Sequence, residues 1–470
     1  MQGIPYRFER TRDAASLRDE FDPLDPGAET GTEVSVAGRI MRHRDTGKLT
    51  FAELRDSSGG IQLFAGANWT ADYDALTRLS LGDWIGAEGT VMKTKKGELS
   101  VKVTAFELLA KALRPLPDKW HGLADVDTRF RQRYVDLIVN EEARRVFDVR
   151  VTAIDALRSF LKEHAFVEVE TPVLHQVIGG ATAKPFFTHH NALDLDLTLR
   201  IALELPLKRL LVGGYENVFE IGRVFRNEGL GTRYNPEFTM LEAYQAFADY
   251  HDMMDLTEQL VAHAAQASVG TTRVGKGDAA VDLTPPWPRQ PMLSLIREYA
   301  GVDVHPSMPA EKLERICDDL DVPHEPGWGP GMLVMEIYEK TVEPNLVGPM
   351  TVCDYPREVS PLARTHRDDP YLVERFEVVV LRRELVNAFS ELTDPVDQRA
   401  RLEEQAALRA SGEEEAMDVD EDYVRALEYG LPPCGGLGMG VDRLVMLLAG
   451  VTSIREVILF PHLRPEAGES

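Results

Sequence analysis

The sequence predicts an α+β protein in which a small N-terminal β-barrel precedes a larger domain built on a mixed, mostly antiparallel sheet. Residues from about 32 to 112 contain short strand-like segments separated by glycine and serine turns, as a small barrel requires. From residue 140 onward, segments of strand and helix character alternate irregularly and are joined mostly by hairpin-length links. Such links favour an antiparallel sheet over a doubly wound parallel one.

The composition is that of a globular chain with more than one domain, with 470 residues of which 44% are hydrophobic. No apolar run approaches the roughly 20 residues that cross a bilayer. The residues that follow Met1 are too charged for a signal peptide. The three cysteines, Cys317, Cys353 and Cys434, are too widely spaced for a zinc site or a disulfide framework. We therefore expect a cytoplasmic location and no membrane partner.

The net charge of −25 is unevenly distributed along the chain. Residues 1–115 carry 16 Lys and Arg against 17 Asp and Glu, so almost all of the excess negative charge lies in the larger domain. Phosphate contacts depend on local basic clusters and not on the whole-chain sum. The N-terminal part has such a cluster, which can bind nucleic acid or can be a solvated basic strand, at Arg39, Arg42, His43, Arg44 and Lys48.

The N-terminal domain is predicted to span residues 1–112. Its clearest strands are 33–40, 60–64 and 99–103, and about five strands in some 80 residues indicate a small barrel of the OB-fold type, which suits base binding. Leu113–Pro117 contains two prolines that exclude a helix, so a linker is predicted over residues 113–139.

The larger domain is predicted to span residues 140–467. Helical spacing of apolar residues predicts a helix from about Asn140 to His164, followed by a strand over Phe166–Pro172 that ends at the proline. Residues 295–345 are expected to be mainly helical and irregular.

The most informative segment is Phe225–Glu242, which predicts a strand, a polar loop and a second strand. On the second strand, Phe238, Met240, Glu242 and Tyr244 share one face. A carboxylate and a phenol beside a phenylalanine are unusual on a core face. This hairpin can stack a base on Phe238, hold a phosphate with Arg226 and hold a cation with Glu242.

A second constellation is the glycine-rich segment Gly435–Arg443, which we interpret as a loop that enters a helix. Glycines allow a close approach of the backbone to a nucleotide, and a helix N-terminus favours anions. Arg443 falls in the first helical turn, where a cation is disfavoured by the helix dipole, so we expect it to have an anionic or aromatic partner.

The third constellation is Glu377–Glu391. Glu377 and Glu384 have opposite parity on a strand, so they share a site only if the chain turns between them, at residues 381–383. Two carboxylates facing a triphosphate would bind Mg²⁺ while phosphates and water complete its shell. The alternative is a surface strand with outward-facing charges. Asn387, Phe389 and Glu391 share one parity and would line one wall.

These segments resemble the signature motifs of class II aminoacyl-tRNA synthetases, in the form found in bacterial lysyl-tRNA synthetases. Phe166–Pro172 is similar to motif 1, Phe219–Tyr244 to motif 2 and Gly436–Arg443 to motif 3. The resemblance begins near residue 5 and covers nearly the whole chain. It includes the stretches Leu113–Lys119, Arg131–Leu137 and Thr188–Asp194. The fold that it implies is an OB-fold anticodon-binding domain followed by a class II antiparallel-sheet catalytic domain.

The resemblance also implies residue roles. Arg226 is expected at the α-phosphate and the substrate carboxylate, and Arg226 and Arg443 are the expected catalytic residues. The implied ATP-binding residues are Arg226, Glu228, Tyr234, Asn235, Phe238 and Arg443, with Phe238 and Arg443 on the two faces of the adenine. The implied lysine-binding residues are Gly180, Glu204, Glu242, Tyr244, Asn387, Phe389 and Glu391. Glu377 and Glu384 match the Mg²⁺ ligands, and the implied anticodon-binding residues are Arg44, Phe51, Gln62 and Glu98.

The implied activity is that of a lysine–tRNA ligase, which activates L-lysine with ATP and Mg²⁺ and transfers it to tRNA(Lys), in a homodimer formed through the motif 1 region. One alternative is a paralogue that activates lysine for a different acceptor, and Phe51 and Gln62 argue against it. Another is a catalytically impaired RNA-binding or regulatory homologue, which the full set of ATP and Mg²⁺ positions disfavours.

Overall fold

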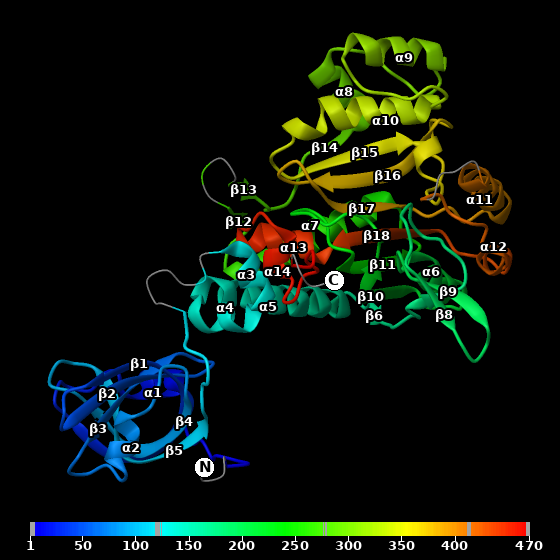
Figure 1. Ribbon diagram of the computed structural model, residues 1–470. Coiled ribbons are helices and arrows are strands. Elements are labelled where there is room, and N and C mark those ends of the chain that lie inside the picture. Colours follow the sequence, from blue (N-terminus) through cyan, green and yellow to red (C-terminus); the bar gives the residue numbers. More distant parts are fainter. Residues whose placement is uncertain are drawn as a thin grey trace. The chain divides into compact units, whose positions relative to one another are not determined.

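The computed structural model describes residues 5–117, 123, 125–275, 277, 280–410 and 415–466, in two compact units, Met1–Ala124 and Asp125–Ser470 (Figure 1). Asp118 and Lys119 of the predicted linker, and the predicted ends at residues 1 and 467, lie outside the described residues. Two helices that fall within the predicted linker range, α3 (Val126–Arg131) and α4 (Arg133–Val139), belong to the second unit.

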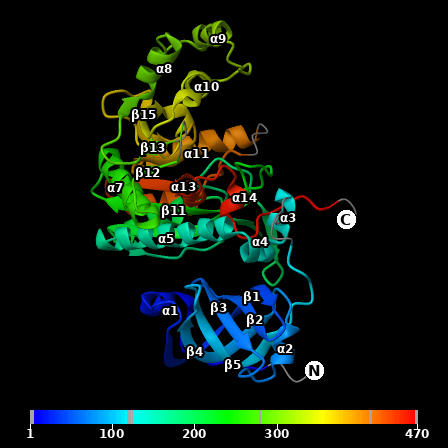
Figure 2. The ribbon, with the colours of Figure 1, turned by 90° about the vertical axis from the view of Figure 1, so that its left-hand side faces the viewer.

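The first unit is a closed five-stranded barrel with the strand order β1-β2-β3-β5-β4, which confirms the predicted barrel (Figure 2). Its side chains alternate, so that Ala52 and Leu54 are buried inside while Phe51 lies outside and is only half-buried. The elements are α1 (Ala14–Phe21), β1 (Glu29–Asp45), β2 (Leu49–Arg55), β3 (Gly60–Gly66), α2 (Tyr73–Thr77), β4 (Trp84–Lys93) and β5 (Leu99–Ala110).

The second unit is built on an eight-stranded sheet with the order β14-β15-β16-β17-β18-β11-β10-β6. Only the pairs β14–β15 and β10–β6 are parallel, so the predicted mostly antiparallel sheet is confirmed. The strands are β6 (Val167–Glu168), β10 (Asn217–Phe225), β11 (Glu237–Ala246), β14 (Arg289–Pro291), β15 (Met350–Pro356), β16 (Leu372–Val379), β17 (Glu384–Ser390) and β18 (Cys434–Gly440).

One face of this sheet is covered by α5 (Glu141–Glu163), α7 (Tyr250–Val269) and α13 (Val441–Ala449), as Figures 1 and 2 show. Helix α5 confirms the predicted helix, and Asn140 caps it by accepting from the amides of Glu142 and Ala143. Leu241 and Ala243 of β11 point into this apolar layer, whereas Glu242 and Tyr244 face the other way. The predicted alternation on this strand is therefore confirmed.

The opposite face carries α6 (Glu204–Val212) against β10 and β11, and α8 (Met292–Ala300) and α10 (Pro330–Thr341) against β15. The predicted helical character of residues 295–345 is confirmed. The remaining elements are β7 (Leu174–His175), β8 (Phe187–His190), β9 (Leu195–Leu199), β12 (Arg273–Val274), β13 (Val281–Asp282), α9 (Ala310–Asp319), η2 (Glu343–Asn345), η3 (Arg357–Val359), α11 (Pro395–Ala410), α12 (Glu421–Glu428) and α14 (Ile454–Val457).

The strand predicted over Phe166–Pro172 is shorter than expected, since only Val167–Glu168 pairs with the sheet. Beyond it, the backbone amide and hydroxyl of Thr171 both donate to Glu220 Oε2, at 3.0 and 2.7 Å. A side-chain acceptor thus takes the place of a sheet partner, and pairing ends before the proline.

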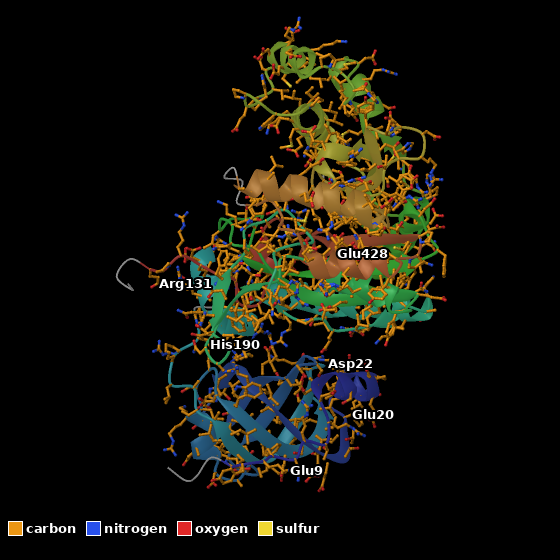
Figure 3. All side chains as sticks on the ribbon, turned by 90° about the vertical axis from the view of Figure 1, so that its right-hand side faces the viewer. Glu9, Glu20, Asp22, Arg131, His190 and Glu428 are labelled. Carbon is orange, nitrogen blue, oxygen red and sulfur yellow. The ribbon has the colours of Figure 1, made fainter. Side chains whose placement is uncertain are left out.

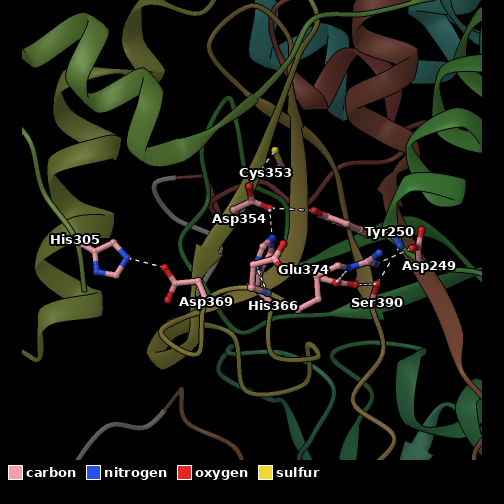
Figure 4. A network of polar contacts seen from close by, with 11 residues as sticks. Asp249, Tyr250, His305, Cys353, Asp354, His366, Asp369, Glu374 and Ser390 are labelled. Atoms are coloured by element: carbon pink, nitrogen blue, oxygen red, sulfur yellow. Dashed lines mark hydrogen bonds and ion pairs between the residues drawn. The ribbon is translucent and has the colours of Figure 1, made fainter. Parts of the chain in front are cut away.

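A network of polar side chains on the α7 side of the sheet connects β15, β16 and β17 by hydrogen bonds (Figure 4). Ser390 Oγ donates to Glu374 Oε2 at 2.6 Å and accepts from the Tyr250 amide at 3.0 Å, and Tyr250 Oη donates to Asp354 Oδ1 at 3.2 Å. These residues come from α7, β15, β16 and β17, so the network fixes the register of these strands. The opposite face of β16 and β17 lines the cavity described below.

Charged side chains project from the surface of both units, among them Glu20 and Asp22 on the first and Glu428 on the second (Figure 3). Among the helices described, none combines the length and the apolar character that crossing a membrane requires.

Candidate functional site

A cavity of about 350 Å³ opens on the sheet face that carries α6. It draws its lining from β11, β17 and β18 and from the segments around residues 180, 202 and 360. Thirteen of the residues predicted for the lysine, ATP and metal positions line it together: Gly180, Glu204, Arg226, Glu228, Tyr234, Asn235, Phe238, Glu242, Tyr244, Glu384, Asn387, Phe389 and Arg443. Glu377 and Glu391 are outside the lining and join the site through their partners.

The hairpin of β10 and β11 forms the side of the cavity at which the sequence predicts a nucleotide. Its loop is closed by the Arg226 amide, which donates to the Pro236 carbonyl at 2.8 Å. The Arg226 guanidinium lies 5.2 Å from the centre of the Phe238 ring, and its Nε donates to the Ile201 carbonyl at 3.3 Å. Burial lowers the pKa of Arg226, while the Glu228 and Glu384 carboxylates oppose this shift. A buried guanidinium beside an aromatic ring suits the phosphate and base of a nucleotide.

Glu242 and Tyr244 form the other end of the cavity. Glu242 Oε1 accepts from the Leu203 amide at 2.8 Å, and Glu242 Oε2 accepts from Tyr244 Oη at 2.9 Å. Glu242 is 3% exposed, and burial, followed by the nearby Glu204 carboxylate, raises its pKa to about 7. Within the described part of the chain no cation forms an ion pair with this carboxylate, so it is suited to bind an ammonium group.

Glu204 lies at the start of α6, where Gly180 approaches it closely. Gly180 has a φ of +86°, which favours glycine, and a Cβ there would lie 3.1 Å from Ala202 Cβ and 3.5 Å from Glu204 Cβ. Glycine therefore satisfies both the backbone conformation and the close packing at this position. Burial raises the pKa of Glu204, and the Lys208 ammonium, 2.5 Å from Glu204 Oε1, opposes the rise. Glu391, only 1% exposed, forms its ion pair with the same Lys208.

The segment Cys434–Gly440 is a strand, β18, so its interpretation as a glycine-rich loop was wrong. It lies between β17 and β11 in the sheet, where its backbone is paired on both edges. A Cβ on Gly436 would lie 2.1 Å from Glu391 Oε1 and 2.4 Å from the Tyr244 ring. Glycine is required there because side chains from both neighbouring strands fill the space above it.

Arg443 has the anionic partner that its place in the first turn of α13 predicts. Its Nη1 donates to the Glu384 carbonyl at 2.6 Å and to Glu384 Oε2 at 3.1 Å. The preceding residue fixes the start of the helix: Asp442 accepts from the Thr239 amide and from Arg150 Nη1, each at 2.6 Å. Sequence reasoning missed Asp442 and Arg150, although an aspartate beside the predicted arginine was a usable signal.

The chain turns between Glu377 and Glu384, as predicted. Val380 and Arg383 exchange backbone hydrogen bonds of 2.9 and 3.2 Å, and Leu381 and Arg382 adopt positive φ angles of 51° and 61°. Burial, and then the Glu384 carboxylate, raise the pKa of Glu377 to about 7. Two carboxylates that repel each other beside an arginine-lined cavity fit a divalent cation with oxygen ligands. No cluster of three or more His, Cys, Asp or Glu that could hold a metal occurs among the described residues.

Arg375 links the metal and lysine positions, and sequence reasoning missed it. It lines the cavity, donates from Nε to Asn387 Oδ1 at 2.9 Å and from Nη2 to Glu377 Oε1 at 2.5 Å. Its guanidinium also lies 4.5 Å from the centre of the Tyr355 ring. Arg233, at the nucleotide end of the lining, was missed as well. The signal for Arg375 is its strand parity with Glu377, which places both on the pocket side.

The barrel carries a separate groove of about 1030 Å³, and all four residues predicted to bind the anticodon line it: Arg44, Phe51, Gln62 and Glu98. Phe51 stacks on Phe64 with ring centroids 5.1 Å apart, on the outer face of the barrel. Gln62 Nε2 donates to Ser100 Oγ at 2.9 Å. Of the basic cluster, Arg42 and Arg44 line the groove, whereas Arg39 lies over the Trp84 ring. Exposed aromatic and basic groups in one groove are typical of single-stranded nucleic-acid binding.

An antiparallel sheet with this nucleotide hairpin, preceded by an OB-type barrel, defines the class of protein. The family model of class II tRNA synthetases (D, K and N) matches residues 125–464, and that of the OB-fold nucleic acid binding domain matches residues 34–109. The chain therefore belongs to the class II tRNA synthetases.

Within that class, the chain belongs to the lysine–tRNA ligase family. It is 52% identical to the lysine–tRNA ligase of Moorella thermoacetica over 461 residues, which cover 98% of this chain and 93% of the relative. It is 53% identical to the lysine–tRNA ligase of Synechococcus sp. (strain CC9311) over 467 residues, which cover 98% of this chain and 96% of the relative. It is 52% identical to that of Trichormus variabilis over 472 residues, covering 98% and 84%.

Proposed function

We propose that this chain activates L-lysine with ATP to form lysyl-adenylate and pyrophosphate, and then transfers the lysyl group to tRNA(Lys). The observation that carries the proposal is a single cavity that joins a cation-seeking carboxylate, Glu242, to a buried guanidinium beside an aromatic ring, Arg226 and Phe238. This arrangement supports the binding of an amino acid with a side-chain ammonium next to a nucleotide. Membership of the lysine–tRNA ligase family supports the same substrates.

In the first step, a lysine carboxylate oxygen attacks the α-phosphorus of ATP in line, and the bond to the β-phosphate oxygen breaks. The attacking carboxylate needs no general base. Arg226 offsets the negative charge that builds up on the α-phosphate and orients the carboxylate, while Phe238 and Arg443 hold the adenine between them. Positioning and charge stabilisation of this kind supply the rate enhancement.

We assign the substrate's ε-ammonium to Glu242, Tyr244 and Glu391, with Asn387 and Phe389 beside it. The α-amino group is assigned to Glu204 and Gly180. The Tyr244 hydroxyl is already committed to Glu242, so it orients this carboxylate for the substrate. Binding of a neutral side chain here would leave buried carboxylates without a cation.

Glu377 and Glu384 would hold Mg²⁺, which neutralises the triphosphate and assists the departure of pyrophosphate when it is bound. Arg375 orients the Glu377 carboxylate, and Arg443 orients that of Glu384. Glu228, Tyr234 and Asn235 complete the ATP positions. Asn235 is already held through its amide, which donates to the Glu237 carbonyl at 2.6 Å, so it shapes the loop around the nucleotide.

In the second step, a ribose hydroxyl of the terminal adenosine of the tRNA attacks the lysyl carbonyl carbon, and AMP leaves. The barrel groove would bind the anticodon, with Phe51 stacking a base and Arg44, Gln62 and Glu98 forming hydrogen bonds. The groove favours a tRNA acceptor over the alternative of a paralogue with another acceptor. We assign this activity to the cytoplasm.

We further propose that the chain forms a homodimer through the region of motif 1. Exposed apolar side chains gather on β6 to β9 and the segments beside them, a signature of a protein interface: Val167, Val173, Leu174, Phe187 and Leu193 are between 39% and 70% exposed. Light scattering should give twice the chain mass, and Phe187→Asp should shift the protein toward the monomer. A wild-type monomer at micromolar concentration would contradict this proposal.

The test of the activity is lysine-dependent exchange between ATP and labelled pyrophosphate, followed by charging of tRNA(Lys). We expect exchange with lysine and none with the other natural amino acids, and lysyl-tRNA as the product. Exchange without charging of any tRNA would establish the paralogue alternative. Absence of both activities in a folded, ATP-binding protein would establish the impaired homologue.

A further inference from the structure

Lys208 is the least expected charged residue of the second unit, because it is fully buried at 0% exposure. Its Nζ lies 2.5 Å from Glu204 Oε1 and forms a second ion pair with Glu391 Oε2. The rings of Phe389 and Tyr423 complete the cage, with centroids 5.4 and 5.9 Å from Nζ. Lysine is almost never buried without such partners, so the site is built around this ammonium.

Lys208 contacts one oxygen of each carboxylate, Glu204 Oε1 and Glu391 Oε2, and its ion pairs leave the second oxygen of each group free of Lys208. Glu204 lines the cavity itself. Glu391 Oε1 is buried and accepts no hydrogen bond among the described residues. It lies just outside the cavity lining and faces Gly436, which lines the cavity together with Tyr244. An orphaned carboxylate oxygen in this position points to a cation that arrives with the substrate.

The buried charges balance only when Lys208 is included. Glu204, Glu242 and Glu391 bring three carboxylates to one end of the cavity, and Lys208 is the ammonium in contact with two of them. Two negative charges then remain, which equals the number of ammonium groups on free lysine. Arg226 and Arg375 do not alter this balance, because Arg226 faces the nucleotide and Arg375 is paired with Glu377.

We propose that Lys208 is a positioning residue that sets the charge and the spacing of the two ammonium subsites, and thereby selects the length of the amino-acid side chain. This inference rests on the proposed function, in which Glu204 takes the α-amino group and Glu391 the ε-ammonium. Because one Nζ contacts both carboxylates, the two oxygens that it contacts can be no farther apart than the sum of the two contact distances. The shared ion pair therefore also limits the separation of the two other carboxylate oxygens, and the two ammonium groups of a diamino acid must match that separation.

The chemistry of the cage gives Lys208 a second effect. Burial lowers the pKa of Lys208, but Glu204 and Glu391 more than offset it, so its pKa lies well above the ordinary value and it stays charged. Burial and the other carboxylates raise the pKa of Glu391, and Lys208 opposes this rise. Loss of Lys208 therefore favours protonation of the carboxylates that bind substrate. The titratable and charged groups around it are Glu204 on α6, Glu242 and Tyr244 on β11, Glu391 after β17, Tyr423 on α12 and Cys434 on β18, with Arg375 of β16 near Glu204.

The test uses pyrophosphate exchange by the full chain with lysine and with ornithine, which is one methylene shorter. Lys208→Met keeps the length and removes the charge. For this variant we expect the lysine KM to rise on the order of tenfold or more, with little change in the ATP KM. The preference for lysine over ornithine should fall toward one from a wild-type value of about 10- to 200-fold. The midpoint of the lysine KM against pH should move upward. Lys208→Arg, which keeps the charge, should leave that midpoint in place while changing the preference.

The matched control is Lys340→Met, which breaks an exposed lysine–glutamate pair of the same i, i+4 spacing on α10 and should change none of these quantities. If Lys208→Met fails to fold, Lys208→Arg carries the test through the lysine-to-ornithine ratio. Folded Lys208 variants with wild-type ratio and pH midpoint, differing only in melting temperature, would overturn the inference. Wild-type protein without lysine-dependent exchange would instead overturn the proposed function.

Discussion

Arg443 and Glu384 are joined by two hydrogen bonds, from Arg443 Nη1 to the Glu384 carbonyl at 2.6 Å and to Glu384 Oε2 at 3.1 Å. They come from the start of α13 and the start of β17, and the family resemblance gives them different tasks, adenine stacking and metal binding. The contact connects the start of α13 to the start of β17 at the wall of the cavity, which both residues line.

The first prediction concerns the metal position. Glu384→Gln should abolish adenylate formation, since a neutral amide binds Mg²⁺ much more weakly than a charged carboxylate does, while the melting temperature and the oligomeric state stay unchanged. Pyrophosphate exchange over a range of Mg²⁺ concentrations measures this. Glu428→Gln, an exposed carboxylate on α12, is the control and should be fully active. A Glu384→Gln variant with the Mg²⁺ dependence of the wild type would place the metal elsewhere.

The second prediction concerns substrate choice. The wild type should prefer lysine over norleucine or methionine by on the order of 10⁴-fold in kcat/KM, because a neutral side chain leaves Glu242 buried without a cation and Glu391 with Lys208 as its sole ion-pair partner among the described residues. Glu242→Gln should lower kcat/KM for lysine by the equivalent of about 2–5 kcal/mol, the cost of breaking a buried charged pair. Exchange kinetics with each amino acid give both ratios. Comparable rates with norleucine would show that these carboxylates do not select the substrate.

The third prediction concerns pH. Glu242 has a pKa of about 7, raised first by burial and then by the Glu204 carboxylate. Lysine binds the ionised form, so its KM should be constant above about pH 8 and should rise up to tenfold per unit below pH 7, with kcat little changed. The measurement is the lysine KM between pH 6 and 8.5. Saturating ATP and Mg²⁺ are needed, because Glu377 also has a pKa of about 7 and would otherwise titrate in the same window. A flat lysine KM across this range would contradict the assignment of Glu242.

The fourth prediction concerns the barrel groove. Phe51→Ala should weaken tRNA binding by about 1–3 kcal/mol through loss of base stacking. Because Phe51 is half-buried on the outer face and stacks only on Phe64 among the rings described, the barrel should remain folded. Charging at limiting tRNA should fall while pyrophosphate exchange is unchanged. Trp84→Ala removes an exposed aromatic residue outside the groove and should have no effect on charging. Equal loss of charging in both variants would argue against base stacking by Phe51.

Much of the site could be predicted because it lies on regular elements with a simple periodicity. Strand parity alone places Phe238, Met240, Glu242 and Tyr244 on one face of β11, and all four line the cavity. The turn between Glu377 and Glu384 was also predictable, since two carboxylates of opposite parity can meet only across a hairpin. The glycine-rich segment misled for a physical reason. Its glycines are required by side chains of the neighbouring strands and not by a local turn, and no local pattern records that crowding.

By itself, the sequence determined the order of the two domains, the faces of the central strands and the residue types that line the cavity, because these follow from local composition and from a period of two along each strand. Only the tertiary structure decided which charges pair in the absence of substrate. Lys208 forms ion pairs with both Glu204 and Glu391. Arg375 donates hydrogen bonds to Asn387 and Glu377, and Arg443 donates one to Glu384. Two of these contacts, Lys208–Glu391 and Arg443–Glu384, join segments far apart in the chain. They depend on how α6, the hairpins and α13 pack against one sheet, and long-range packing of this kind leaves no periodic signal in the sequence.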